Sequence, residues 1–430
     1  MTTLRPLKEK RINTRNVTIL VVQLGFGILF FAFYFTILQE YRRLNVESDT
    51  IAHINGALSL VEHIKNGLKG ISEFKETASY SHLIAYPVWH LTVCFVHKIV
   101  YLIIPGITIE TSANIAAAFV NSLSIVVALG ILIKHFVYRI NCNYPLAAKI
   151  IICLGLIFVG PFDASGTLNN YYLGGYTGNI WHNPTYILVR TIGLIVFFSY
   201  TDILSNRGAT LKQYIMTSVL LTVSAFCKPN FYQSFLPGLV VVCIVYFLIQ
   251  RNKKTFLECL KIAGTCVPLV IIALMQYTFA LPESGEGRIG VKFLYVWKHF
   301  TDNWELSLIV SLIFPVFVYS VMAFKRQWNI QMVLSVSMLV SAVAQYMFFY
   351  VAAGPFAGDF SWGIGLAIFF LFVTAAERLA ETNITSGKFS RFINIGGWGI
   401  FLLHLFFGII YFYNIWTRLE VTAPLRYWWQ

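Results

Sequence analysis

The chain has 430 residues, of which 57% are hydrophobic, 16% aromatic and only 12% charged. So few charged side chains cannot cover a soluble protein of this size, and the composition is that of a polytopic membrane protein. A formal net charge of +13 would suit nucleic acid, but Lys and Arg lie mostly in short stretches between apolar runs, as the positive-inside rule requires. Nothing resembles a nucleic-acid-binding module, so we expect no nucleic-acid partner.

The N-terminal stretch is basic and leads directly into a long apolar segment. Residues 17–38 are apolar and long enough to cross a bilayer. A cleaved signal peptide would have a shorter apolar core and a small-residue cleavage site. We therefore predict a cytoplasmic N-terminus at residues 1–16, followed by a retained first helix.

Residues 39–111 are predicted to form one long outer segment that carries membrane-hugging helices. An amphipathic helix is indicated by apolar residues spaced three and four apart, namely Ile51, Ile54, Leu58, Val61, Ile64 and Leu68. A second apolar run at 82–104 contains three histidines and a lysine, which are costly in a true span. If this run crossed the membrane, every later basic loop would fall outside, so we place it at the surface.

Ten further apolar segments follow, at 112–137, 146–162, 186–204, 212–227, 232–250, 259–281, 305–324, 329–351, 362–380 and 392–415. With the first helix they make eleven predicted spans, so the expected fold is an all-α polytopic membrane domain with its helix bundle at 112–415. This arrangement gathers the basic loops on the inner side, for example Arg251, Lys253 and Lys254. The C-terminal tail, 416–430, then lies outside.

Asp49 stands at the start of the outer segment, in a chain with only 19 Asp and Glu residues. The simple interpretation is structural, because Ser48 can cap a helix and Asp49 suits its positive N-terminal dipole. The chemical alternative is that Asp49 acts as a general base or as a ligand for a divalent cation. No cofactor is otherwise indicated, since the seven cysteines include no CxxC pair.

Other polar residues on the predicted outer side are candidates for binding substrate. His53, His82 and His90 could orient Asp49, bind substrate or hold a metal, although a single interfacial histidine is often only hydrogen-bonded. Lys228 lies at the outer end of a span, where it could meet a phosphate group or simply extend its amine to water. Arg288, in the loop before the eighth predicted span, is a second candidate phosphate ligand.

The stretch from Trp181 to Thr185 combines an aromatic ring, a histidine and amide groups with a proline turn. Sugars bind to such surfaces by stacking on aromatic rings and by hydrogen bonds to amides. Trp181, His182 and Asn183 are therefore expected to line a sugar site. The alternative is that the tryptophan anchors the chain at the membrane interface.

The layout resembles that of GT-C-type integral membrane glycosyltransferases. These proteins have a first helix, a long outer loop that opens with an acidic residue and carries juxtamembrane helices, and then a bundle of many spans. Four short segments are similar to those of bacterial members of this group: Tyr86-Pro87-Val88-Trp89-His90, residues 179–185, Lys228-Pro229 and residues 359–363. The resemblance implies that Asp49 is catalytic, as a base or through a metal. Some families have an adjacent Asp pair where this chain has Glu47 and a lone Asp49, which leaves metal dependence open.

The resemblance also implies a reaction. A sugar would pass from a polyprenyl-phosphate donor to a glycan or lipid acceptor of the cell envelope, at the outer face of a bacterial plasma membrane. Two alternatives share the many-span fold. One is a flippase or transporter of a lipid-linked saccharide, which needs no carboxylate at its rim. The other is a polysaccharide polymerase, which usually concentrates arginines in large later outer loops.

Overall fold

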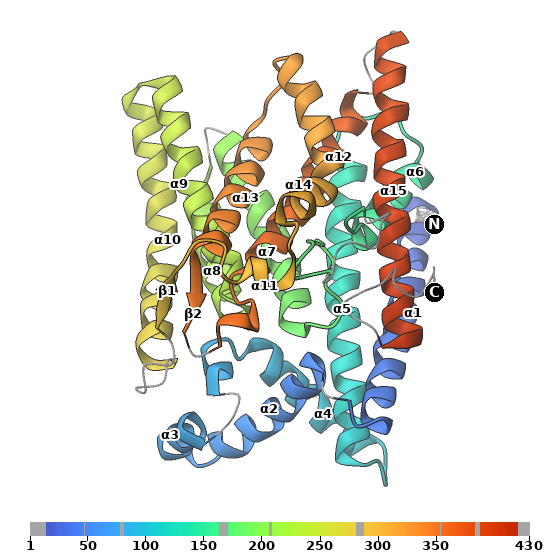
Figure 1. Ribbon diagram of the computed structural model, residues 1–430, viewed down its shortest axis with the longest axis vertical. Coiled ribbons are helices and arrows are strands. Elements are labelled where there is room, and N and C mark those ends of the chain that lie inside the picture. The colour runs from blue at the N-terminus through green and yellow to red at the C-terminus, as the bar shows by residue number, and fades with distance from the viewer. Residues whose placement is uncertain are drawn as a thin grey trace, which may run out of the picture.

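The computed structural model describes residues 14–46, 48–77, 81–162, 171–205, 209–280, 288–352, 354–382 and 388–419. Over these residues the chain is an all-α polytopic membrane protein (Figure 1). Nine of the described helices are long and apolar enough to cross a membrane. They are α1 (Thr14–Arg43), α5 (Ile109–Tyr138), α7 (Pro184–Ser205), α9 (Asn230–Gln250), α10 (Lys253–Ala280), α12 (Trp304–Phe324), α13 (Ile330–Phe348), α14 (Ser361–Thr382) and α15 (Lys388–Arg418).

These nine helices correspond to nine of the eleven predicted spans. The helix in the span predicted at 329–351 ends at Phe348, because residues 349–351 form a short strand. The other two predicted spans, 146–162 and 212–227, correspond to shorter apolar helices. They are α6 (Leu146–Phe158), with 13 residues, and α8 (Leu211–Cys227), with 17 residues. A span needs roughly 20 residues to cross a flat bilayer, so length and composition alone identify nine crossing helices in the described chain.

The segment between α1 and α5 forms a layer at one end of the bundle, called the loop end here. It contains α2 (Asp49–Ile64), α3 (Gly67–Thr77), the 3-10 helix η1 (Ser81–Ala85) and α4 (Val88–Ile103). Helices α1 and α5 pack along one another, and α2, α3 and α4 lie together at the lower end in Figure 1. The amphipathic pattern of residues 51–68 is divided between α2 and α3, because Gly67 turns the chain with a positive φ of 63°.

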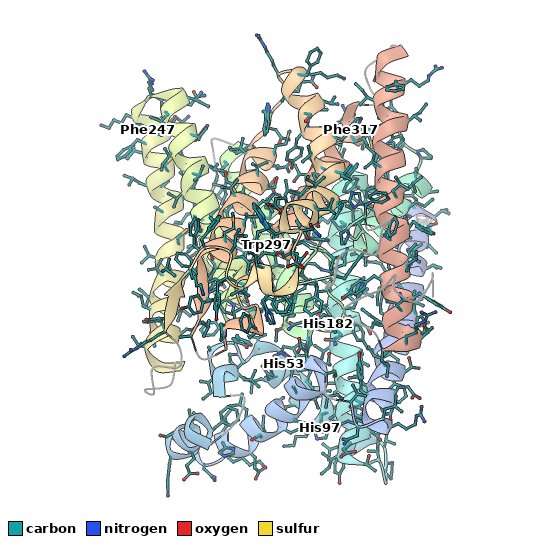
Figure 2. All side chains as sticks on the ribbon, viewed as in Figure 1. His53, His97, His182, Phe247, Trp297 and Phe317 are labelled. Carbon is teal, nitrogen blue, oxygen red and sulfur yellow. The ribbon has the colours of Figure 1, made fainter. Side chains whose placement is uncertain are left out.

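Helix α14 forms the centre of the bundle. Most of its side chains are fully buried, and it packs against α7, α9, α12 and α13. Gly365 allows the loop before α7 to approach closely, since a Cβ there would lie 2.9 Å from the Thr177 carbonyl oxygen and from the Tyr186 hydroxyl. The N-terminal part of this central helix thereby packs closely against the segment before α7 and the first turn of α7. Figure 2 shows how side chains fill the space between the helices.

Two short strands and two short helices complete the described structure. Strand β1 (Ile289–Val291) pairs antiparallel with β2 (Phe349–Val351), with Gly290 opposite Tyr350. Helix α11 (Trp297–Phe300) and the 3-10 helix η2 (Pro355–Ala357) lie in the connections before α12 and α14. These elements join the N-terminal ends of α12 and α14 to the C-terminal ends of α10 and α13.

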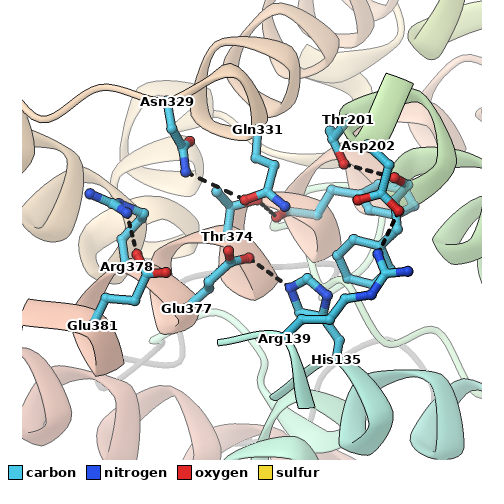
Figure 3. Close-up of polar contacts among 12 residues, drawn as sticks. His135, Arg139, Thr201, Asp202, Asn329, Gln331, Thr374, Glu377, Arg378 and Glu381 are labelled. Carbon is cyan, nitrogen blue, oxygen red and sulfur yellow. Dashed lines mark hydrogen bonds and ion pairs between the residues drawn. The ribbon is translucent and has the colours of Figure 1, made fainter. Parts of the chain in front are cut away.

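A polar network joins helices at the opposite end of the bundle (Figure 3). His135 Nε2 lies 3.0 Å from Glu377 Oε2, and both side chains are buried. The Gln331 amide, with its NH₂ group turned toward Glu377, lies within hydrogen-bond distance of both carboxylate oxygens. Arg139 and Asp202 form an ion pair at 2.5 Å. The network therefore links α5, α7, α13 and α14.

Candidate functional site

Asp49 is the first residue of α2, and its carboxylate faces the start of α7. Ser48 provides the helix cap, because its hydroxyl oxygen accepts a hydrogen bond from the Ile51 amide at 3.3 Å. The Asp49 carboxylate is thus free for another contact: its Oδ2 accepts a hydrogen bond from Asn183 Nδ2 at 3.2 Å. The side chain remains 46% exposed. An anchored carboxylate with an open side can act as a base.

Asn183 is the residue before α7, and its side chain caps the N-terminus of that helix. Its Oδ1 accepts hydrogen bonds from the Tyr186 amide at 2.9 Å and from the Thr185 hydroxyl at 3.0 Å. Pro184, the first helical residue, needs no hydrogen-bond acceptor for its nitrogen. The side-chain oxygen therefore caps the helix, while the side-chain NH₂ group is available to hold Asp49.

Lys228 follows α8 and its side chain is buried, with the residue only 6% exposed. Its Nζ donates to Thr185 Oγ1 at 3.2 Å and to Asn183 Oδ1 at 3.4 Å. The ammonium also lies 4.9 Å from the centre of the Trp362 ring and 5.8 Å from that of Tyr86. Among the described residues it forms no ion pair. Burial lowers the pKa of Lys228 to about 8, although the carboxylates of Asp49 and Asp359 oppose this shift.

Several helices begin around this lysine. Helix α7 starts one residue after Asn183, and α9 starts two residues after Lys228. The start of α9 is tied to the segment before α14, because Asn230 Nδ2 donates to the Asp359 carbonyl oxygen at 2.6 Å. Helix N-termini carry partial positive charge and attract anions. We call Asp49, His182, Asn183, Lys228 and Trp362 the Lys228 cluster; its cation and helix ends suit a phosphate group.

His182 is also buried, at 5% exposed. Its Nε2 lies 3.9 Å from Asp49 Oδ2, and its ring centre lies 4.4 Å from that of Tyr172. Within the part of the chain that the structure describes, neither ring nitrogen has a hydrogen-bond partner. Burial lowers the pKa of His182; Asp49 opposes this effect and Lys228 adds to it. The imidazole is therefore neutral at pH 7.

Trp181 has a different environment from its neighbours. Its side chain is fully buried, and its ring packs against Phe30 at 5.2 Å, Phe412 at 5.5 Å and Phe158 at 5.7 Å. On another side, the Arg190 guanidinium lies 5.6 Å from the ring centre. The ring joins α1, α6 and α15 in the core, and this enclosure leaves no exposed face on which a sugar could stack.

The loop histidines form a second pair. His53 Nδ1 lies 2.9 Å from His90 Nε2, and both residues are buried between α2 and α4. His90 is also bonded to the Tyr86 carbonyl oxygen at 3.3 Å. This pair fastens α4 to α2. The backbone of His82 lies in η1, but its side chain lies outside the described residues.

Arg288 lies away from the polar contacts of the Lys228 cluster. It is exposed just before β1, and its carbonyl oxygen accepts from the Ala352 amide at 2.8 Å. Its side chain makes no hydrogen bond or ion pair with any described residue. In the same described ranges, no three His, Cys, Asp or Glu side chains lie close enough together to hold a metal ion.

Trp362, Tyr86 and Tyr172 are site residues to which the sequence assigned no role. Trp362 and Tyr86 place their rings beside Lys228, and Tyr172 stacks near Trp362 with ring centres 5.9 Å apart. A local signal was available for two of them. Trp362 is the second residue of α14 and lies three residues after Asp359, and Tyr86 precedes Pro87, the N-cap of α4.

An apolar groove of about 740 Å³ lies between α9 and α13. It is lined by Pro237 and Val241 on α9, by the small residues Ser337, Ser341 and Ala344 on α13, and by neighbouring apolar side chains. Pro237 has no N–H, so the Gln233 carbonyl oxygen is left without a helical donor. Gln345 supplies one through its Nε2 at 2.7 Å. A second groove, of about 640 Å³, lies between α8 and α10.

Comparisons with known proteins provide no assignment. No protein-family model and no curated protein sequence matches this chain.

Proposed function

We propose that the protein is a GT-C-type membrane glycosyltransferase. It transfers a sugar from a polyprenyl-phosphate donor to a glycan or lipid acceptor of the cell envelope. The observation that carries the proposal is the chain of contacts Asp49–Asn183–Lys228. The half-exposed Asp49 carboxylate and the buried Lys228 ammonium contact opposite ends of the Asn183 side-chain amide. This amide lies at the N-terminus of α7. In this proposal all eleven apolar segments span a bacterial plasma membrane, the N-terminus is cytoplasmic, and the loop end and C-terminus face outward.

Asp49 is the general base in this scheme. Its carboxylate takes the proton of the acceptor hydroxyl, and the acceptor oxygen forms a bond to the anomeric carbon of the donor. The bond between that carbon and the phosphate oxygen breaks, and its electron pair leaves with the phosphate. The charge that develops there is stabilised by Lys228 and by the helix N-termini. His182 and Asn183 lie on the inner side of the carboxylate.

A lipid-linked donor is favoured by the groove between α9 and α13. The groove begins near Gln345, whose amide contacts the first turn of α9 at Gln233. Lys228 and Pro229 lead directly into that same turn. A phosphate held by Lys228 would therefore have an apolar groove within about one helical turn for the chain attached to it.

The decisive experiment measures turnover of a panel of radiolabelled polyprenyl-phosphate sugars by purified protein in detergent. Wild type should release lipid phosphate with at least one donor, and Asp49→Asn should not. Glu110→Gln is the matched control, since Glu110 is also an acidic residue in the first turn of a helix at the loop end, and it should retain full turnover. Turnover by Asp49→Asn equal to wild type would remove Asp49 from the mechanism.

The flippase or transporter alternative uses the same cation and groove but breaks no bond in the donor. Specific binding of a lipid-linked sugar, unaffected by Asp49→Asn and without turnover of any donor in the panel, would support it. A polymerase would instead consume lipid-linked oligosaccharides and lengthen them, which the size of the labelled product reveals.

A further inference from the structure

His182 has an unusual environment for a buried histidine. The residue is 5% exposed, yet neither ring nitrogen has a hydrogen-bond partner among the described residues. A buried donor or acceptor without a partner costs free energy. The ring lies beside the candidate base, with its Nε2 3.9 Å from Asp49 Oδ2, so a small movement of either side chain would give the imidazole a hydrogen-bond partner.

The position of the ring is fixed from several sides. The His182 carbonyl oxygen accepts a hydrogen bond from Thr50 Oγ1 at 2.7 Å, which ties the residue to the first turn of α2. The ring packs against Tyr172 in a T-shaped arrangement, and its centre lies 6.3 Å from that of Trp362. The carboxylate of Asp49 is the acidic group near its Nε2, at 3.9 Å. This distance exceeds a hydrogen bond by about 1 Å.

The two oxygens of Asp49 have different surroundings. Asn183 Nδ2 bonds to Oδ2, and the same oxygen faces His182 Nε2. No described residue contacts Oδ1 by a hydrogen bond or ion pair, and the side chain is about half exposed. One oxygen is therefore held from inside the protein, and the other is open to an incoming molecule.

We propose that His182 is a positioning residue for Asp49. When an acceptor binds, the Nε2–H group of the neutral imidazole donates to Oδ2 and, with Asn183, holds the carboxylate with Oδ1 toward the acceptor hydroxyl. The proton of that hydroxyl passes to Oδ1. The acceptor oxygen bonds to the anomeric carbon, and the bond from that carbon to the phosphate oxygen breaks with its electron pair. This inference rests on the proposed function, because it takes Asp49 as the base.

The surroundings of the His182 ring favour the neutral form of its imidazole. Asp49 lies beside the ring at the start of α2, and Lys228 lies beside it at the end of α8. The phenol ring of Tyr172 packs against it from the loop before α7. Beyond Lys228 lie Asp359 and Tyr86. With the lysine nearby and little exposure to water, the imidazole gains no proton at neutral pH, so its donor is an uncharged N–H.

Two variants test this role by kinetics. His182→Gln keeps an N–H donor near the position of Nε2, whereas His182→Phe keeps a ring and removes the donor. We expect kcat to fall roughly 100-fold in His182→Phe, the size expected for a misplaced catalytic group, and much less in His182→Gln. The KM for the donor should not change in either. Equal losses in both variants, or a raised donor KM, would overturn the proposal and make His182 a ligand of the donor.

A second measurement does not depend on turnover. In protein labelled with ¹³C-histidine, the signal of His182 is identified by its absence from the His182→Gln spectrum, and its pKa is measured by titration. Asp49→Asn should lower that pKa, because Asp49 raises it in the wild type, and Glu110→Gln should not. An unchanged pKa in Asp49→Asn would refute the pairing. If no donor is turned over but the pKa responds, the proposed function fails while the Asp49–His182 pair stands.

Discussion

A single amide, that of Asn183, joins Asp49 to Lys228. Its Nδ2 donates to Asp49 Oδ2 at 3.2 Å, and its Oδ1 accepts from Lys228 Nζ at 3.4 Å. The same oxygen caps α7. The residue that starts a helix thus also sets the relative position of the candidate base and the candidate phosphate ligand.

Replacing Asn183 separates these two roles. Asn183→Ser keeps a good cap but cannot reach both partners, whereas Asn183→Ala loses the cap as well. The free energy of unfolding of Asn183→Ser should lie within a few tenths of a kcal/mol of the wild-type value. That of Asn183→Ala should be lower by about 1 kcal/mol. Both should lose most of the turnover. Thermal unfolding and donor turnover are measured on the same preparations, and wild-type turnover in Asn183→Ser would show that the amide bridge is dispensable.

The pKa of Lys228 predicts how ligand binding depends on pH. Burial lowers the pKa of Lys228 to about 8 in the folded protein, whereas the pKa of an unfolded lysine is about 10.4. Affinity for a polyprenyl phosphate should therefore fall as the pH rises through about 8, because the cation is lost. Lys228→Arg should keep its affinity above that pH, since guanidinium stays charged. Lys228→Met should bind weakly at every pH.

The lowered pKa of Lys228 also predicts that the stability of the folded protein depends on pH. Between about pH 8 and 10.4 the unfolded chain holds more protons on this group than the folded chain. The contribution of Lys228 to the unfolding free energy therefore rises with pH across that window. Relative to Lys228→Met, the wild type should gain thermal stability from pH 8 upward. A difference between the two proteins that is constant with pH would contradict the lowered pKa.

The two grooves allow a matched test of where a lipid chain binds. Ala344→Leu adds bulk to the groove between α9 and α13, and should raise the KM for a long-chain donor roughly tenfold, the value of about two buried methylene groups. It should leave a donor with a short chain unaffected. Gly264→Leu adds the same kind of bulk to the groove between α8 and α10, where a Cβ meets open space, and should change neither KM.

The His135–Glu377 pair predicts strong coupling at the opposite end of the bundle. Both side chains are less than 10% exposed, so His135→Leu leaves the buried Glu377 carboxylate with the Gln331 amide but without the imidazole, and should cost about 3 kcal/mol. The double variant with Glu377→Leu should recover part of that loss. Arg139→Ala breaks a pair that is about half exposed and should cost about 1 kcal/mol at most. Additive losses in the double variant would rule out the coupling.

Much of the membrane architecture could be predicted from the sequence because its signals are local. The length of each apolar run decides whether a helix can cross a bilayer, and nine predicted segments have helices of that length. Ser48 as a cap, with Asp49 following it in the first turn, is also a local signal, and the structure has this cap. The apolar pattern of residues 51–68 predicted helix, but it did not predict the break at Gly67.

The site itself required the tertiary structure. Asp49 and Asn183 are separated by 134 residues and Lys228 lies 45 beyond Asn183, and no periodicity within a helix specifies which helix ends meet. For the same reason, residues that are adjacent in the sequence can have different surroundings in the structure. Trp181 and His182 are neighbours in sequence, but packing against α1, α6 and α15 encloses the first in the core, while the first turn of α2 places Asp49 beside the second. Sequence determines which helices form, and only their packing decides which side chains share a site.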